Sequence, residues 1–274
     1  YLGVDVAYPN LEANIQLVDK ISSYANLLII GASGISANRN ETNLNELVQY
    51  ASSKGLSFIV YTDDPRYPTA QWYNATIRQY GNRFLGLYLF DEHGGHQLDR
   101  DNDYLNVWNA NDYEDAANKF VSGVRPWISR FSSLAGGLPV FTSDYALYWY
   151  DYNAGFSTVF AQFCSNYSQQ ITMALCRGAA TVQNKDWGAI ITWKYNSAPY
   201  LESGQDLYDD MMLAYNFGAK YVLVFNYPYD SNSTYGILKQ EHLDALRNFW
   251  NYTNSNPPAS SSPWPTIPTG PAFR

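Results

Sequence analysis

The sequence alternates eight times between a short apolar run, rich in β-branched and aromatic residues, and a longer amphipathic segment. The apolar runs are continuous and do not alternate strictly with polar residues, which is typical of parallel strands covered by helices. They lie at residues 2–8, 26–33, 57–63, 84–92, 138–145, 157–163, 187–195 and 220–228. Helical patterns lie at residues 11–24, 44–53, 70–80, 112–134, 169–182, 205–217 and 239–252.

This eightfold count favours a closed α/β barrel of the (β/α)8 (TIM) type over an open doubly wound sheet, and ~250 residues is a usual length for such a barrel. No glycine-rich fingerprint follows the first run, which reads VAYPNLE, so dinucleotide binding is not expected. Two parts of the pattern are irregular. Residues 145–155 show no helical periodicity, and Pro126 is a candidate break in the helix at 112–134.

The composition changes after Tyr252, where proline and serine dominate. Such a segment is extended in part and cannot form a packed core. We therefore predict a barrel domain over residues 1–252 and a Ser/Thr/Pro-rich extended tail, a linker or stalk, over residues 253–274.

The charge balance limits the partners. With 17 basic and 25 acidic residues the formal net charge is −8, which argues against nucleic acid and anionic lipid as ligands. No stretch of 18 apolar residues is present, so no membrane span is predicted.

Aromatic residues reach 17%, which is more than a core alone needs. Some of these rings are expected to line a sugar-binding cleft or a protein interface.

Five N-x-S/T sequons occur, and together with the low charge and the tail they favour a secreted or cell-surface glycoprotein. Their acceptors are Asn40, Asn74, Asn166, Asn232 and Asn251.

Cys164 and Cys176 are expected to be free, buried thiols. A helix starting soon after Cys164 would separate them by ~15 Å, well beyond disulfide reach, whereas a later start would reverse this expectation.

In a (β/α)8 barrel the active site lies at the carboxyl ends of the strands, which turns the predicted strands into a list of candidates. The list is rich in carboxylates and aromatic rings and poor in histidine and cysteine. It contains Asp5, Tyr8, Asp63, Asp64, Asp91, Glu92, His93, Asp144, Tyr145, Gln162, Trp193, Lys194, Asn226 and Tyr227.

Carboxyl groups beside aromatic rings are suited to cleaving glycosidic bonds, where one acid protonates the leaving oxygen and a second attacks the sugar or activates water. Glu92 is the best candidate acid, because it precedes a glycine-rich loop that allows close approach of a ligand. The second carboxylate is Asp144, Asp5 or Asp63. An aspartate at a strand end equally serves to cap a helix or fix a loop, so each has a structural interpretation as well.

The remaining candidates are assigned to substrate binding. Tyr8, Tyr145 and Trp193 would stack on sugar rings, Asp91 would contact the substrate, and Lys194 and Asn226 would position hydroxyl groups. Lys194 has two other interpretations, a Schiff-base amine and a salt bridge to a carboxylate at the barrel mouth. His93 and His96 lack helical spacing and a nearby third histidine, so no metal and no cofactor are predicted.

The eight-strand pattern over residues 1–252 and the pair Asp91-Glu92 at the fourth strand end resemble the (β/α)8-barrel glycoside hydrolases. In the large retaining clan of these enzymes the acid/base glutamate occupies that place, so the resemblance implies this role for Glu92. The clan's nucleophilic glutamate ends the seventh strand, where this chain has Trp193 and Lys194 and the nearest carboxylate is Glu202.

Two functions follow as expectations. The first is a secreted or cell-surface hydrolase that cleaves a polysaccharide or glycan, with carbohydrate as its partner. The second is an extracellular structural or adhesive glycoprotein built on an inactive barrel that associates with itself or with other surface proteins. The missing seventh-strand carboxylate favours the second, and a lyase or aldolase that uses Lys194 is a third option.

Overall fold

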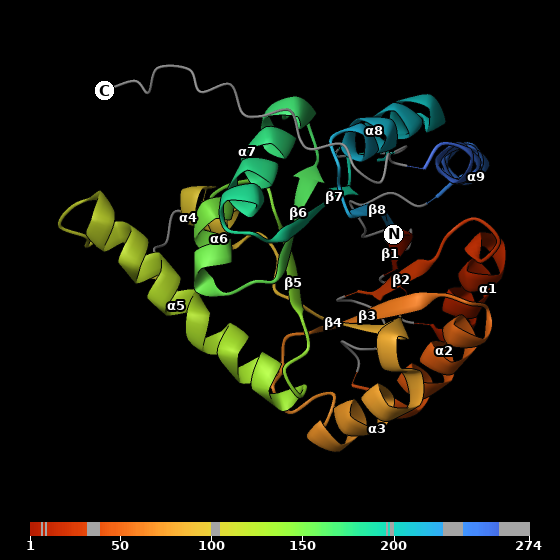
Figure 1. Cartoon of the computed structure of the whole chain (residues 1–274), viewed down its shortest axis with the longest axis horizontal. Helices are drawn as coiled ribbons and strands as arrows, with labels where there is room; N and C mark the ends of the chain where they lie inside the picture. Colours follow the sequence, from red (N-terminus) through yellow and green to blue (C-terminus); the bar gives the residue numbers. More distant parts are fainter. Residues whose placement is uncertain are drawn as a thin grey trace.

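The computed structural model describes residues 1–6, 8, 10–31, 39–99, 105–195, 197, 200–226 and 238–257. Eight parallel strands follow one another around a closed barrel in sequence order, and β1 pairs with β8 to close it (Figure 1). This confirms the predicted (β/α)8 barrel. The strands are β1 Leu2–Val6, β2 Leu27–Ile30, β3 Ser57–Thr62, β4 Phe84–Leu89, β5 Val140–Asp144, β6 Thr158–Phe163, β7 Asp186–Ile191 and β8 Tyr221–Asn226.

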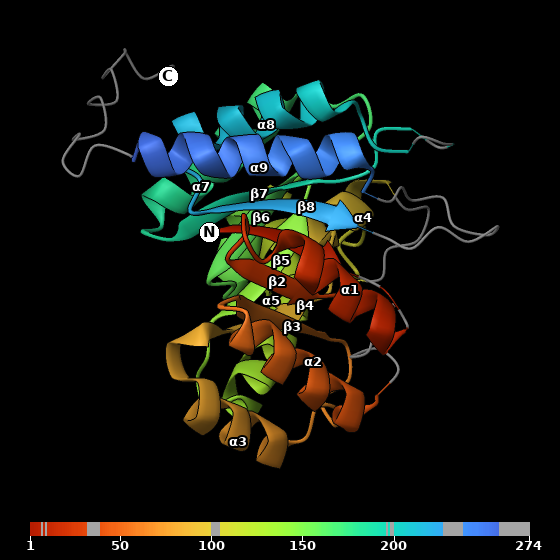
Figure 2. The ribbon, with the colours of Figure 1, turned by 90° about the vertical axis from the view of Figure 1, so that its right-hand side faces the viewer.

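Helices surround the strands (Figures 1 and 2). The described helices are α1 Leu11–Ile21, α2 Glu41–Ser53, α3 Ala70–Tyr80, α4 His93–Asp99, α5 Tyr113–Leu134, α6 Tyr148–Ala154, α7 Gln169–Val182, α8 Gly204–Asn216 and α9 Gln240–Ser255. In Figure 2 the strands run from left to right, and α4 lies at the right-hand side, beside their carboxyl ends. The predicted tail beyond residue 257 lies outside the described residues.

The helices differ from the sequence pattern in two respects. α5 continues through Pro126, because this proline and Ser122, one turn earlier, are both exposed, so water can satisfy the carbonyl that loses its donor. The short helices α4 and α6 lie where the sequence showed no helical periodicity. Seven residues are too few for a clear repeat, and contacts with the barrel stabilise each of them.

The barrel interior is filled by side chains. Tyr61, Tyr88, Phe141, Phe160 and Tyr221 form its aromatic centre, with Phe141 and Phe160 stacked at 5.7 Å between ring centroids. A second, larger apolar layer lies between the strands and the helices. The interior is therefore a packed core and not a pore, and ligands must bind at its rim.

Both cysteines are buried and free, as expected. Cys164 follows β6, whereas Cys176 lies in α7, where it contacts the hydroxyl of Tyr152. Among the described helices, none combines the length and the apolar character needed to cross a membrane.

Candidate functional site

A polar layer covers the aromatic core at the carboxyl ends of the strands. The hydroxyls of Tyr88 and Ser143 are 2.6 Å apart, and the Gln162 amide donates to the same serine oxygen at 2.9 Å. These three side chains come from β4, β5 and β6, so their hydrogen bonds fix the floor of the barrel mouth. Tyr88 and Ser143 were not among the sequence candidates, although the period-two alternation within each strand would have indicated them.

Asp5 extends this floor from β1. Its side chain is only 2% exposed, and no described group forms a hydrogen bond with Oδ1. A Cβ atom on Gly31 would lie 2.6 Å from that oxygen, so only glycine fits opposite it. Burial, and secondarily the charge of Asp91, raise the pKa of Asp5 well above its usual value. Burial therefore favours the protonated form of Asp5.

Asp91 and Glu92 follow β4 at the rim. Glu92 has φ +60°, an uncommon value for a non-glycine residue, and its N–H donates to the Ser143 carbonyl at 2.8 Å. Its carboxylate contacts His96, with 3.1 Å between Oε2 and Nε2, and both side chains are about 30% exposed. The backbone of Glu92 is thus held in a strained conformation that directs its side chain.

Burial among neighbouring atoms and then the charge of Glu92 raise the pKa of Asp91 to about 6. The side chain of Asp91 is nevertheless in contact with solvent, which screens part of the rise in its pKa. The two carboxylates affect the pKa of several neighbours. Asp91 raises the pKa of Asp5 and Tyr61, Glu92 raises that of Cys164, and both raise that of Tyr88. Both carboxylates therefore lie within electrostatic range of the buried floor of the mouth.

Asp144 lies behind this rim. It is completely buried, and its carboxylate accepts N–H groups from Gly94 at 2.5 Å, Gly95 at 2.9 Å, Tyr145 at 2.7 Å and Ala146 at 3.0 Å. Burial raises its pKa and that of buried Asp151, whose pKa the charge of Asp144 raises further. Asp144 thus holds the first turn of α4, the capping role that the sequence left open.

Tyr145 belongs to an aromatic face near Glu92. Its hydroxyl donates to Asp99 at 2.7 Å, and its ring stacks on Tyr167 at 5.7 Å. Tyr167 is half exposed and can offer the other side of the pair to a ligand. It lies in the loop after β6, outside every predicted strand, so no sequence pattern indicated it.

Trp193 and Lys194 follow β7 and are half-buried. Lys194 makes no ion pair within 4 Å in the described part of the chain, but its charge opposes the rise in pKa of Glu202 and Asp210. Burial and then Asp210 raise the pKa of Glu202 to about 8. Glu202 is thus a buried acid in a carboxyl pair and not a carboxylate open to the mouth.

A hydrogen bond joins Asn226 at the end of β8 to Tyr8 in the loop after β1. The Asn226 amide donates to the Tyr8 hydroxyl at 2.7 Å, and its oxygen accepts from the N–H of Leu238 at 3.0 Å. Asn226 is completely buried, so its polar atoms are already used. Asp63 is exposed at the rim, and Tyr227 lies outside the described residues.

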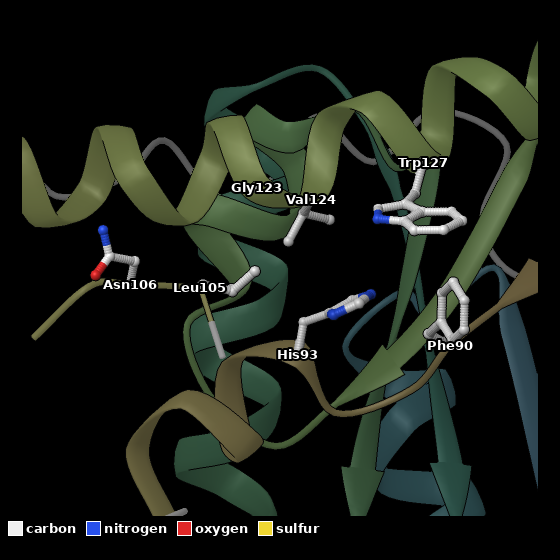
Figure 3. Close-up of a pocket in the computed structure, with 7 residues that line it drawn as sticks. All are labelled: Phe90, His93, Leu105, Asn106, Gly123, Val124 and Trp127. Atoms are coloured by element: carbon white, nitrogen blue, oxygen red, sulfur yellow. The ribbon is translucent and has the colours of Figure 1, made fainter. Parts of the chain in front are cut away.

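The histidines do not form a cluster. His93 is in ring contact with Phe90 and Phe156, and burial lowers its pKa to about 4. Figure 3 shows His93 facing Phe90 and Trp127 in an apolar pocket beside α5. Within the described ranges no three His, Cys, Asp or Glu side chains are arranged to hold a metal ion.

Solved structures similar to this chain include several glycoside hydrolases. An endo-β-1,4-mannanase from Thermotoga petrophila gives a TM-score of 0.60 at 11% identity, covering 95% of this chain and 78% of the mannanase. A β-galactosidase from Marinomonas ef1 gives 0.63 at 10% identity, covering 93% of this chain and 60% of that one. An endo-1,4-β-mannanase from Rhizomucor miehei gives a TM-score of 0.56 at 9% identity, covering 93% of this chain and 95% of the mannanase.

At these identities the likeness establishes a barrel fold shared with glycoside hydrolases, without a specific family. No protein-family model and no curated protein sequence matches the chain.

Proposed function

We propose that the protein hydrolyses glycosidic bonds in a polysaccharide or glycan, with Asp91 and Glu92 as the reacting carboxyls. One observation carries the proposal. Two adjacent carboxyls, Asp91 and Glu92, follow β4 at the barrel mouth, where Asp5 lies buried at the carboxyl end of β1. Two carboxyl groups flanking one bond are what this chemistry requires.

In the proposed reaction Glu92 donates its proton to the glycosidic oxygen as the bond to the anomeric carbon breaks. Asp91, ionised above about pH 6, takes a proton from water, whose oxygen joins the anomeric carbon. In the retaining variant Asp91 attacks that carbon directly, and water then releases the sugar. His96 contacts Glu92 and is partly exposed, so it can return a proton from solvent.

The substrate would be held by groups around these acids. The Tyr145–Tyr167 pair presents an aromatic face to a sugar ring, and Trp193 presents another after β7. Lys194, half-buried after β7, carries donors for sugar hydroxyls. The charge of Asp91 raises the pKa of Asp5, so the two carboxyls lie close enough to influence each other. Asp144 contributes by fixing the α4 turn that carries His96.

We also propose that the protein works outside the cell, secreted or at the cell surface. Four of its five sequon asparagines, Asn40, Asn74, Asn166 and Asn251, are exposed and accessible to a glycosylating enzyme, and Asn232 lies outside the described residues. Treatment of the native protein with an endoglycosidase, followed by intact mass measurement, tests this. A protein whose mass equals that of the bare polypeptide, and does not change on treatment, would contradict it.

The inactive structural barrel stays as the alternative because one observation favours it. β7 is followed by Trp193 and Lys194, and the carboxyl of Glu202 is buried against Asp210, so the seventh strand offers no open nucleophile. This version predicts self-association and no hydrolysis at all.

A polysaccharide panel scored for new reducing ends separates the two functions, with light scattering of the same samples as the second readout. Release of sugar that follows enzyme concentration supports the hydrolase. Polymerisation without release from any polysaccharide overturns it. Borohydride trapping with each substrate tests the Lys194 option, because only a Schiff base adds a stable mass to the protein.

A further inference from the structure

A second cavity, of about 450 Å³, lies at the rim between the segment after β3 and helix α5. None of the acids proposed to react lines it. Its lining is Arg39, Asp63, Asp64, Pro65, Arg66, Trp127 and Arg130. Three arginines and two aspartates line it, so the cavity has a positive formal charge in a chain whose net charge is −8.

Asp64 organises two of these arginines. Its carboxylate is only 7% exposed and takes a two-pronged hydrogen bond from Arg66, with Nε to Oδ1 at 2.9 Å and Nη2 to Oδ2 at 2.8 Å. Arg39 Nη2 reaches the same Oδ2 at 2.8 Å. The arginine side chains themselves are 79% and 56% exposed. Their remaining donors are therefore held in place and open to a ligand.

Arg130 lines the same cavity from α5. It is exposed and forms no hydrogen bond or ion pair with any described residue. Trp127 lies one turn earlier in the helix, 46% exposed, and its ring meets Phe90 edge-on at 6.1 Å. An exposed guanidinium beside an exposed indole is suited to a sugar ring that carries an anionic group.

Trp127 also connects this cavity to the apolar pocket of about 490 Å³ shown in Figure 3. There its indole projects from α5 toward Phe90 and His93. Phe90 directly precedes Asp91 in the chain. Trp127 thus lines both cavities, and Phe90 and His93, on either side of Asp91 and Glu92 in the chain, line the apolar one.

We propose that the cavity binds the carboxylate or sulfate group of an acidic polysaccharide, with the sugar ring against Trp127 and the anion at Arg130, Arg66 and Arg39. The inference rests on the proposed function and names its substrate class. The three guanidinium groups outnumber the carboxylates of Asp63 and Asp64, so the cavity attracts anions. A neutral glycan would gain nothing from this positive charge.

Isothermal titration with the Glu92→Gln variant, which leaves the ligand intact, tests the inference. The probes are an oligogalacturonate, a heparin-derived sulfated oligosaccharide and a neutral manno-oligosaccharide. We expect at least one anionic probe to bind ten times more tightly than the neutral one, and more weakly as salt rises. Adding Arg130→Gln should weaken that binding on the order of tenfold, the effect of losing one charged hydrogen bond.

Trp127→Ala should weaken all sugars that bind, whereas Arg78→Gln, on an exposed helical arginine outside the cavity lining, should change nothing. Binding of only one anionic probe identifies the anion and supports the inference. Equal affinity for neutral and anionic probes, no binding of any probe, or an Arg130→Gln variant that binds as before would overturn it.

The failure of this inference and that of the proposed function are distinguishable. Binding of an anionic probe that depends on Arg130, with no hydrolysis of its parent polysaccharide by the wild-type protein, sustains the anion site and overturns the hydrolase. Hydrolysis of a neutral polysaccharide by a protein that has no affinity for anionic probes sustains the hydrolase and overturns the anion site.

Discussion

His96 Nε2 lies 3.1 Å from Glu92 Oε2, one helical turn further along α4. In the proposed reaction His96 serves as a proton carrier for Glu92. His96→Gln should therefore lower turnover about tenfold, within the range of a positioned proton-transfer group. Rates measured for both single variants and for the double variant check this. If the two residues act as a unit, the double variant is no slower than Glu92→Gln alone. Fully additive losses would contradict the relay.

Asp144 should prove essential to the rim without touching substrate. Asp144→Ala leaves four N–H groups without their acceptor, two of them buried and two partly buried, so the free energy of unfolding should fall by about 3 kcal/mol or more. Urea denaturation measures this. Asp19→Asn, at an exposed ion pair with Lys54, is the control and should cost less than about 1 kcal/mol. A stable Asp144→Ala protein with full activity would refute the assigned role.

Two helical glycines provide a matched pair of substitutions. A Cβ on Gly95 would lie 2.0 Å from the Tyr145 ring, so Gly95→Ala should displace that ring, disrupt its bond to Asp99 and lower sugar affinity. Gly178 has open space around it, and Gly178→Ala should stabilise α7 by about 0.5–1 kcal/mol. Thermal melts and ligand titration measure both. Unchanged affinity in Gly95→Ala would exclude Tyr145 from the binding face.

The buried acid pairs predict that stability depends on pH. The pKa of Glu202 is about 8 in the folded protein and near 4.5 when unfolded, so the folded state keeps a proton that the unfolded state has lost. Its stabilising effect is complete below about pH 4.5 and disappears as the pH rises toward 8. Asp144, with a pKa raised to about 7, acts in the same direction.

Between pH 5 and pH 8 we therefore expect the free energy of unfolding to fall, on the order of 2 kcal/mol for the Glu202 contribution. Glu202→Gln stays neutral throughout and should flatten the curve. Denaturation curves at a series of pH values measure the slope. Identical slopes in the wild-type and Glu202→Gln proteins would show that Glu202 is ionised in the fold.

The sequence predicts the barrel well because each strand is a continuous apolar run and each long helix has a clear period. It fails at α4 and α6, where capping by Asp144 and packing against the barrel stabilise segments too short to show periodicity. The strand-end rule located Asp5, Asp91 and Glu92. It could not tell that Asp144 faces away from the mouth, because the sequence alone did not fix which residues of β5 point inward.

Other residues of the site depend on tertiary structure. Tyr167 pairs with Tyr145 from a loop, and Asp64 joins Arg39 and Arg66 across two loops, so no sequence spacing relates them. Asn226 occupies a strand end as predicted, yet its amide is used by Tyr8 and Leu238.

The most direct measurement of the central claim is the initial rate of reducing-end release by the wild-type and Glu92→Gln proteins on the best substrate of the panel. This substitution keeps the size and shape of the side chain and removes its acidic proton. We predict a fall of at least a hundredfold, the usual contribution of a general acid, with an unchanged melting temperature. Equal rates in the two proteins would contradict the assignment of Glu92.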